Sequence, residues 1–247
     1  MITASLNKAK KISRAGRATM KATARAPFRA LKKINPVKYL KDRQFPLRDF
    51  QTKVFVYQTT ENFILKTVEN VFELRQALKL RHEVFYKELQ NKESGNDLDI
   101  DEFDSICDHL IIIDKKTSRV VGTYRMISST FAEDFYSEGE FDIAAIKKLP
   151  GNKLELGRAC IHEDFRTGAI INLLWKGIAE YIKKTETKYL FGCASVQTTD
   201  PVQASKLLAY LRSKDLSSEE LGVKPAEKYR SEISIQAVDA ADAKDIP

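Results

Sequence analysis

The 247-residue sequence lacks any run of about 18 or more apolar residues, so no transmembrane helix is expected. It also lacks an apolar signal-peptide core near its N-terminus. Only three cysteines are present, Cys107, Cys160 and Cys193, and their spacing matches neither a C-x-x-C metal site nor a disulfide framework. We therefore expect a reducing cytoplasm and interpret each cysteine as a small buried hydrophobic residue.

Several catalytic motifs are missing as well. The sequence contains no G-x-S-x-G nucleophile elbow, no phosphate-binding loop and no metal-ligand spacing, so no metal or redox cofactor is expected. A Cys–His pair is the nucleophile that remains open, with Cys107 near His109 or Cys160 near His162 on one face of a strand. Cysteines in strands more often belong to the core. His82 is interpreted as a surface histidine.

Acidic residues are almost absent from residues 1–45, which contain 13 Lys and Arg and a single acid, Asp42, for a net charge of +12. The remaining 202 residues contain 28 basic and 33 acidic residues, for a net charge of −5. We therefore expect two parts, a basic, partly helical and partly disordered arm at 1–45 and a mildly acidic folded body at 46–247.

The basic residues of the arm are spaced by three or four, so they would form a narrow cationic stripe on a helix, which Pro27 and Pro36 would interrupt. The apolar face is weak, so electrostatic binding to an anionic membrane surface, at about 1 kcal/mol per basic residue, is the interpretation we carry forward. A solvated tail without a partner is an alternative of equal weight. Nucleic acid is disfavoured because the arm lacks interleaved aromatic residues, and a mitochondrial transit peptide is a minor alternative.

The pattern of the body predicts an α/β fold with a mixed sheet. A strand, helix and strand over 154–196 form a crossover unit, which requires a parallel pair of strands. The acidic segment 91–108 is expected to be a loop, and 131–149 to be irregular with short helices. The periodicity predicts strands at 53–58, 63–68, 109–114, 120–128, 154–161, 189–196 and 231–238, and helices at 71–90, 168–184 and 200–214.

The expected strand at 154–161 carries Glu155, Gly157 and Arg158 in its middle, where apolar residues are usual. In a regular strand, Glu155 and Arg158 would point to opposite faces. Gly157 permits a β-bulge, which would shift the register by one residue and bring both charges to the same side. The bulge would also free backbone N–H groups to bind an acyl carbonyl oxygen.

Other charged residues fall where burial is expected, and buried charges need partners. Arg81 lies on the apolar face of the first helix, and Arg125 lies within a strand. Two interpretations are open: a structural ion-pair network, and a site that binds a charged small molecule and catalyses acid–base chemistry. The basic and acidic members are equal in number: Arg81, Arg125 and Arg158, with Asp101, Asp104 and Glu155.

Five sequence blocks together resemble the ornithine N-acyltransferases, acyl carrier protein-dependent relatives of the GNAT acyltransferases that are often labelled hemolysin-like. The match covers roughly residues 54–215 and leaves out the basic arm. The blocks are LRHEVFYKE, DIDEFDSICDHLIII, VVGTYRM, LELGRACIHEDFRTGAIINLLWKGIAEYI and YLFGCASV. More distantly, the pattern resembles acyl-homoserine lactone synthases and long-chain N-acyl amino acid synthases. The shared motifs correspond here to Arg81 with Phe85, Asp101 with Asp104, Arg125, and Glu155 with Arg158.

The resemblance implies a GNAT-like mixed, twisted sheet with a splayed and bulged central strand and flanking helices. It also implies transfer of a 3-hydroxylated fatty acyl group from acyl carrier protein to the α-amine of ornithine, giving lyso-ornithine lipid. In this reaction Glu155 would accept the amine proton, and N–H groups near Gly157 and Arg158 would stabilise the oxyanion. Arg125 or Arg158 would bind the substrate carboxylate.

The remaining shared positions would contribute to substrate binding. Arg81 and Phe85 belong to this set by resemblance, and Asp101 and Asp104 would either order their loop or bind the cationic end of the substrate.

The acyl donor is suggested by a departure from the GNAT pattern. Enzymes that use acetyl-CoA carry a Q/R-x-x-G-x-G/A loop, which holds the pyrophosphate at a helix N-terminus. Here the turn reads RTGAIIN, which keeps Arg166 and Gly168 but has a different glycine spacing. Coenzyme A is therefore disfavoured, no cofactor is expected to be resident, and the expected donor is the 4'-phosphopantetheine thioester of acyl carrier protein, with its phosphate near Arg166 and Gly168.

The expected partners are acyl carrier protein, the amino-acid substrate and an anionic membrane surface, with the protein in the cytoplasm at the inner membrane. Transfer to glycine or another amino acid, and acyl-homoserine lactone synthesis, are open alternatives in the same chemistry. A non-enzymatic membrane-surface protein, as the hemolysin label suggests, is the contrasting class. The complete set of charged motif residues argues against a catalytically silent GNAT-like binding module.

Overall fold

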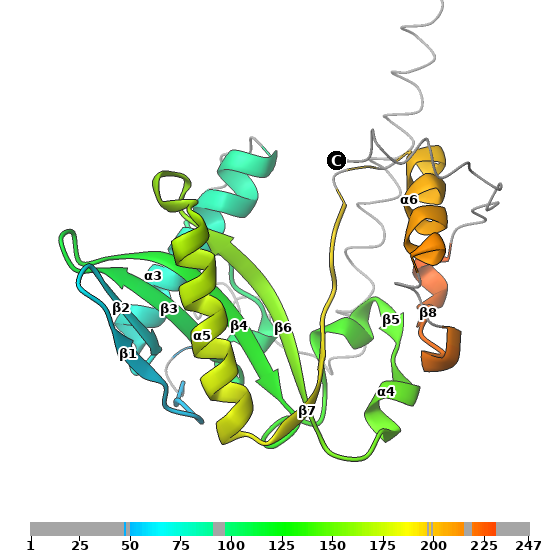
Figure 1. The fold of residues 1–247 in the computed structure, drawn as a ribbon, viewed down its shortest axis with the longest axis horizontal. Helices are drawn as coiled ribbons and strands as arrows, with labels where there is room; N and C mark the ends of the chain where they lie inside the picture. Colours follow the sequence, from blue (N-terminus) through cyan, green and yellow to red (C-terminus); the bar gives the residue numbers. More distant parts are fainter. Residues whose placement is uncertain are drawn as a thin grey trace, which may run out of the picture. The chain divides into compact units, whose positions relative to one another are not determined.

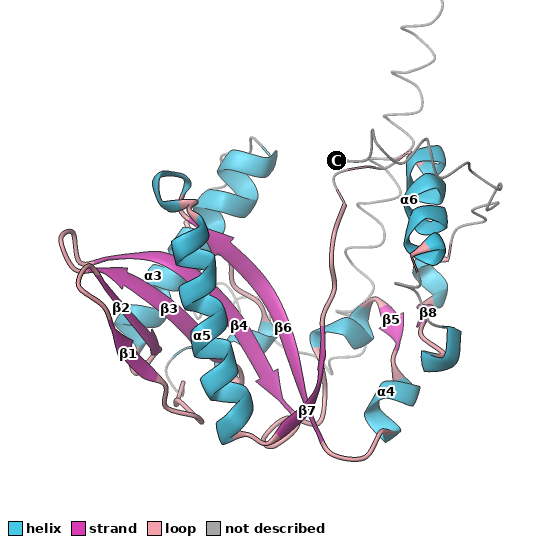
Figure 2. Ribbon diagram, viewed as in Figure 1, coloured by secondary structure: helices cyan, strands magenta, loops and turns pink. Residues whose placement is uncertain are grey.

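The computed structural model describes residues 47, 50–90, 97–196, 198, 200–214 and 219–230. The arm at 1–45 and the candidate strand at 231–238 lie outside these residues, so both stay predictions, as does the division into arm and body. Within the described residues, strands and helices follow one another in the expected order, with short helical turns between them (Figure 2).

A six-stranded mixed sheet forms the centre of the described body (Figure 1). Neighbouring strands are antiparallel except for β6 and β7, which run parallel because a helix crosses between them. In spatial order the strands are β1 (Tyr57–Thr59), β2 (Phe63–Thr67), β3 (Asp108–Asp114), β4 (Arg119–Ser128), β6 (Asn152–Ile161) and β7 (Thr187–Phe191).

Two helices cover opposite faces of this sheet. Helix α5 (Gly168–Lys184) packs on the face that carries Leu110 and Ile112 of β3, and α3 (Val71–His82) packs on the face that carries Ile111. Successive residues of a strand point to opposite faces, so β3 is buried on both sides. The remaining elements are α4 (Ala144–Lys148), α6 (Pro201–Ser213) and a small ribbon of β5 (Phe141–Asp142) with β8 (Lys224–Pro225).

Two predicted strands have wrong boundaries, and one predicted helix contains an irregular turn. The strand expected at 53–58 is reduced to β1, because the backbone N–H groups of Lys53 and Val54 donate to the carboxylate of Asp108, 2.9 Å away, instead of to a neighbouring strand. The helix expected at 71–90 is present over that range, and within it Glu83–Glu88 form a π-helical turn that was not predicted. The strand expected at 189–196 ends at Phe191, where it leaves β6.

Strands β6 and β7 separate part-way along β6. Their parallel register ends where Glu155 lies opposite Phe191, and β6 continues to Ile161 without a described β7 partner. Gly192 lies at the point of separation, where a Cβ would be 2.2 Å from the carbonyl oxygen of Leu156. Only glycine permits this close approach, so Gly192 is required where the chain leaves β6.

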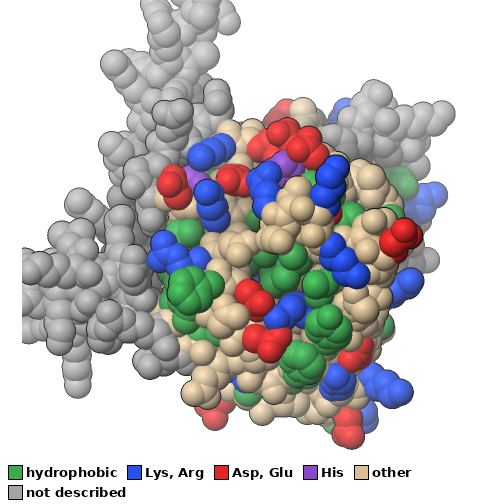
Figure 3. All heavy atoms as spheres, turned by 90° about the vertical axis from the view of Figure 1, so that its left-hand side faces the viewer, with side chains coloured by type: hydrophobic (Ala, Val, Ile, Leu, Met, Phe, Trp, Pro, Cys, Tyr) green, Lys and Arg blue, Asp and Glu red, His purple; other side chains and the backbone are tan. Residues whose placement is uncertain are grey.

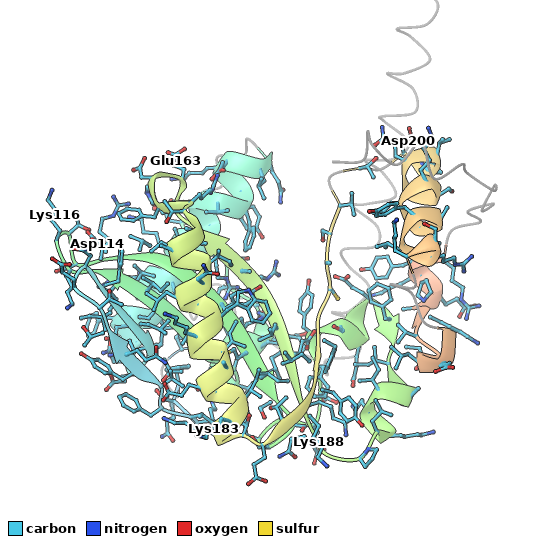
Figure 4. The ribbon with its side chains drawn as sticks, viewed as in Figure 1. Asp114, Lys116, Glu163, Lys183, Lys188 and Asp200 are labelled. Carbon is cyan, nitrogen blue, oxygen red and sulfur yellow. The ribbon has the colours of Figure 1, made fainter. Side chains whose placement is uncertain are left out.

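The last turn of helix α5 contains Lys183 and Lys184, which complement the negative end of the helix dipole, whereas its first turn contains no acidic residue. Glu163 belongs to the 3₁₀ turn before the helix, and Figure 4 shows it and Lys183 at opposite ends of α5. On the face shown in Figure 3, acidic, basic and hydrophobic side chains are interspersed. None of the helices in the described ranges combines the length and apolar content needed to cross a membrane.

Candidate active site

A cavity of about 570 Å³ lies where β6 separates from the segment that follows β7. The middle of β6 forms one wall, and the segment after β7 contributes another part of the lining. The lining residues come from the π-helical turn and the residues after it (Phe85, Leu89, Gln90), β4 (Tyr124, Arg125, Ile127), the 131–149 segment (Tyr136, Glu140), β6 (Glu155, Leu156, Gly157, Arg158, Ala159) and the segment after β7 (Cys193, Ser195).

Strand β6 contains the β-bulge that the sequence predicts. Arg158 and Ala159 together lie opposite the single residue Tyr124 of β4. The φ angle of Arg158 is 50°, so the arginine, and not Gly157, adopts the left-handed conformation, at a cost of about 1 kcal/mol or more. As predicted, the bulge brings Glu155 and Arg158 to the same cavity.

Gly157 leaves open space beside the bulge. No described atom lies within 4 Å of the position that a Cβ would take there. A glycine in the interior of a strand often marks a place where a ligand comes close to the backbone. The cavity therefore reaches the main chain of β6 at the residue before the bulge.

The carboxylate of Glu155 is held by three donors from one short turn. Its Oε2 accepts a hydrogen bond from the backbone N–H of Tyr136 (2.7 Å), and its Oε1 accepts one from the N–H of Ser137 (2.8 Å) and one from the Ser137 hydroxyl. The side chain is 2% exposed. Burial raises the pKa of Glu155 above its usual value, although the Ser137 and Tyr136 hydrogen bonds oppose the shift. A raised pKa suits a carboxylate that takes a proton from an amine near neutral pH.

Arg158 lies at the open side of the charged cluster, with 28% of its side chain exposed. Its guanidinium lies over the rings of Phe85 and Tyr136, with distances of 5.9 and 5.2 Å to the ring centroids. Its Nη2 donates to Asp101 over a long 3.4 Å. The guanidinium is therefore oriented by aromatic rings while part of it faces the cavity.

A second set of charges is buried behind the cavity. The guanidinium of Arg81 is 0% exposed and donates to Asp99 (2.8 Å) and to both oxygens of Asp104 (2.6 and 3.2 Å). Arg125 donates to both oxygens of Asp101 (2.7 and 2.6 Å). Burial opposes the charge of Arg81, but the two carboxylates outweigh it and raise its pKa.

The same network fixes the loop before β3. Asp101 caps a short 3₁₀ helix at Glu102–Ser105, and Asp101 and Asp104 exchange hydrogen bonds with one another's backbone as a capping box. Neither carboxylate lines the cavity, and neither does Arg81. The predicted site residues thus divide into Phe85, Arg125, Glu155, Gly157 and Arg158, which line the cavity, and Arg81, Asp101 and Asp104, which support the residues around it.

Sequence reasoning missed several residues of the site. Tyr136, Ser137 and Glu140 come from a segment with no hydrophobic periodicity, so no pattern marked them. Cys193 was assigned to a strand that in fact ends earlier, and its Sγ donates to the Ser137 hydroxyl at 3.3 Å. Asp99 alternates with Asp101 in the DID sequence, which was a signal for two acids on one side of the chain.

The Cys–His pairs do not form an activated nucleophile. Cys107 and Cys160 are buried, and burial raises the pKa of both thiols, to about 12 for Cys160. Burial also lowers the pKa of His109 to about 4, and its Nε2 lies 3.0 Å from the carbonyl oxygen of Asp104. The interpretation of His82 as a surface histidine is wrong, because it is 1% exposed and its ring stacks on Tyr86 at 5.2 Å.

Arg166 and Gly168 lie near the start of α5 and do not line the cavity. The guanidinium of Arg166 pairs with both oxygens of Glu88 at 2.5 and 2.6 Å, which raises its pKa. No described atom lies within 4 Å of a Cβ placed on Gly168, so the first turn of the helix is sterically open there. Across the described part of the chain, no cluster of three or more His, Cys, Asp or Glu residues has a geometry that could hold a metal ion.

Comparison with known proteins places this chain in a family. A model described as an acetyltransferase (GNAT) domain matches residues 80–176. An L-ornithine N(alpha)-acyltransferase from Rhodobacter capsulatus is 32% identical over 195 residues, which cover 74% of this chain and 74% of the relative. The chain belongs to the L-ornithine N(alpha)-acyltransferase family. It is therefore an acyltransferase, and its curled mixed sheet with flanking helices is the GNAT fold.

The chain is also similar to other enzymes of this name and, at lower identity, to a solved structure. The L-ornithine N(alpha)-acyltransferase of Agrobacterium fabrum is 30% identical over 72% of this chain and 66% of its own length. The chain spans about half of the enzymes of that name from Brucella abortus (54%) and Rhizobium meliloti (55%). Among solved structures, the AHL synthase LasI aligns with a TM-score of 0.42 and 17% identity over 61% of this chain and 79% of that chain.

Proposed function

We propose that this acyltransferase moves a 3-hydroxy fatty acyl group from acyl carrier protein to the α-amine of ornithine and forms lyso-ornithine lipid. The family supports acyl transfer, and the names of its relatives support ornithine as the acceptor. The observation that carries the proposal is the cavity in which Glu155 and Arg158 meet at the β6 bulge. It offers a buried base and a cation to a molecule that carries both an amine and a carboxylate.

Glu155 accepts the proton of the attacking amine, directly or through a water molecule. The nitrogen forms a bond to the thioester carbonyl carbon, the carbon–sulfur bond breaks, and the pantetheine thiolate leaves and takes up a proton. The raised pKa of Glu155 brings the carboxylate closer to the pH at which an amine must be deprotonated. The Tyr136 and Ser137 hydrogen bonds orient it without blocking access from the cavity that it lines.

Backbone N–H groups near Gly157 and Arg158 stabilise the oxyanion. Beyond Glu155, β6 pairs with no described strand on the side from which β7 departs, and its main chain borders the cavity there. Donors fixed by the fold stabilise developing negative charge without reorganising during the reaction. The absence of a side chain at Gly157 allows a thioester carbonyl to come close.

Arg158 binds the carboxylate of the acceptor. Both Arg125 and Arg158 line the cavity, but Arg125 is 2% exposed and its guanidinium is taken up by Asp101. Arg158 has a more exposed side chain and only a long contact with Asp101. A carboxylate that enters the cavity can therefore form two parallel hydrogen bonds with Arg158.

The acyl donor is the phosphopantetheine thioester of acyl carrier protein, and coenzyme A is disfavoured. The phosphate is held near the start of α5, where Arg166 exchanges Glu88 for the phosphate and Gly168 leaves the helix N-terminus open.

The basic arm at 1–45, outside the described residues, docks the protein on the anionic inner membrane surface, where the product partitions. If deleting residues 1–45 leaves sedimentation with anionic vesicles unchanged, the docking role is contradicted.

The function is tested by mass spectrometry of lipids from a bacterium that makes no ornithine lipid and expresses either this protein or its Glu155→Ala variant. We expect a new lipid whose fragmentation gives ornithine and a 3-hydroxy acyl chain, absent with the variant. A new acylated glycine or other amino acid would replace ornithine in the proposal. No new lipid, with both proteins present at equal levels, would contradict it.

A further inference from the structure

The charged residues that line the cavity form a small set. Of the described lining residues, only four carry a formal charge: Arg125, Arg158, Glu140 and Glu155. The function proposed above uses Arg158 for the carboxylate and Glu155 for the α-amine. One acidic side chain in the cavity, Glu140, therefore has no role in the reaction.

The backbone of Glu140 is held on both sides. Its N–H donates to the carbonyl oxygen of Ser137 at 3.0 Å, and its own carbonyl oxygen accepts from the N–H of Ala226 at 2.8 Å. Burial raises the pKa of the Cys193 thiol and of the Tyr136 hydroxyl, and the nearby carboxylate of Glu140 raises both further. Because both neighbours also line the cavity, the carboxylate belongs to the cavity wall.

Glu140 differs from Asp101, Asp104 and Glu138 in its partners, and like Glu155 it forms no ion pair with a described residue. Asp101 and Asp104 are bound to arginine side chains, and neighbouring Glu138 pairs with Lys147. Among the described residues, no Lys or Arg side chain lies within ion-pair distance of Glu140. A carboxylate in a partly buried cavity without a cationic neighbour favours a cation supplied by a ligand.

We propose that Glu140 binds the side-chain ammonium of the acceptor and makes the cavity selective for diamino acids over neutral amino acids. This inference rests on the proposed function and names a specificity residue for it. Each of the three polar groups of a diamino acid then has a charged partner in the cavity. The carboxylate binds Arg158, the α-amine contacts Glu155 and the side-chain ammonium binds Glu140. With the far ammonium held, the α-amine is the one presented to the thioester.

The test compares ornithine with norvaline, which has the same carbon chain but no side-chain amine. The measured quantity is the ratio of kcat/KM for ornithine to kcat/KM for norvaline, with an acyl carrier protein thioester as donor. We expect the wild-type protein to prefer ornithine and Glu140→Gln to lower the ratio by about 10- to 100-fold, since a charge-assisted hydrogen bond is lost. Glu138→Gln, which removes a carboxylate two residues away, is the matched control and leaves the ratio unchanged.

The outcomes separate this inference from the function on which it rests. If the wild-type protein acylates ornithine and Glu140→Gln keeps the wild-type ratio, the role of Glu140 is wrong and the function stands. If the wild-type protein has equal kcat/KM values for norvaline and ornithine, the proposed selectivity for diamino acids is wrong. This outcome does not depend on whether the variant folds. If the wild-type protein acylates no diamino acid at all, the proposed function fails first, and the inference with it.

Discussion

Two groups of charged residues lie within the same fold and differ in how completely they are paired. Behind the cavity, Arg81 is enclosed by Asp99 and Asp104, and neither acid is more than 3% exposed. Facing the cavity, Arg158 has a partly exposed guanidinium with only long contacts to carboxylates. Similar residue types thus serve two purposes: complete pairing fixes the loop before β3, and incomplete pairing leaves charge to bind a substrate.

The largest effect should come from the base on the cavity side. We expect Glu155→Gln to lower kcat by about 100- to 10,000-fold, because the amide cannot accept the amine proton. Burial raises the pKa of Glu155, so the wild-type activity should fall with decreasing pH at a higher pH than an exposed glutamate would give. This acid limb should be missing from the residual activity of the variant, and an unchanged pH–rate profile would contradict the assignment.

The buried group should affect stability rather than specificity. Arg81→Ala leaves Asp99 and Asp104 buried without their cation, and we expect a loss of about 3–5 kcal/mol in the free energy of unfolding, measured with denaturant. Lys79→Ala, at an exposed position of the same helix, is the control and should change the free energy of unfolding by no more than about 0.5 kcal/mol. Equal losses in the two variants would show that the cluster is not structural.

Arg158 should affect binding of the acceptor more than folding. Arg158→Ala is expected to raise KM for the amino acid by about 10- to 100-fold, because a bidentate contact with the carboxylate is lost. Arg158→Lys should recover only part of this loss, since lysine keeps the charge but not the planar fork. A full recovery would indicate a general electrostatic role, and a fall in kcat alone would contradict carboxylate binding.

Two glycines near the separation of β6 and β7, Gly192 and Gly157, should have different effects when replaced by alanine: one on stability and the other on activity. Gly192→Ala places a Cβ against the carbonyl oxygen of Leu156 and should cost about 1–3 kcal/mol of stability. Gly157→Ala meets open space, so stability should change by about 1 kcal/mol or less while the methyl group enters the cavity and lowers kcat/KM. Thermal melting and steady-state kinetics of both variants provide the check, and a reversed order would contradict the geometry.

Much of the sheet could be predicted from the sequence because its strands and α5 have strong hydrophobic periodicity. The expected helix at 168–184 coincides with α5, and the strand–helix–strand unit gave the parallel pair of β6 and β7. The bulge was predicted from Gly157 and the spacing of Glu155 and Arg158, whereas the left-handed conformation of Arg158 was not. Patterns of charge within apolar segments thus located the β6 side of the cavity.

The rest of the site could not be predicted, because it depends on residues without periodicity. Ser137 and Glu140 lie in an irregular segment that only the folded chain brings to β6. The premature end of β7 depends on Gly192, whose close contact with Leu156 is a tertiary feature. The sequence likewise does not show which acidic residues pair with arginines and which line the cavity. That distinction requires the three-dimensional structure.

The central claim is that the cavity at the β6 bulge transfers an acyl group from a carrier thioester to an amino acid. The most direct measurement incubates the purified full-length protein with 3-hydroxyacyl-acyl carrier protein and ornithine, and follows both products by mass spectrometry. The account predicts equal amounts of Nα-acyl ornithine and free carrier thiol, and almost none of either with Glu155→Gln. Release of free fatty acid without acyl ornithine, or equal product from the variant, would contradict it.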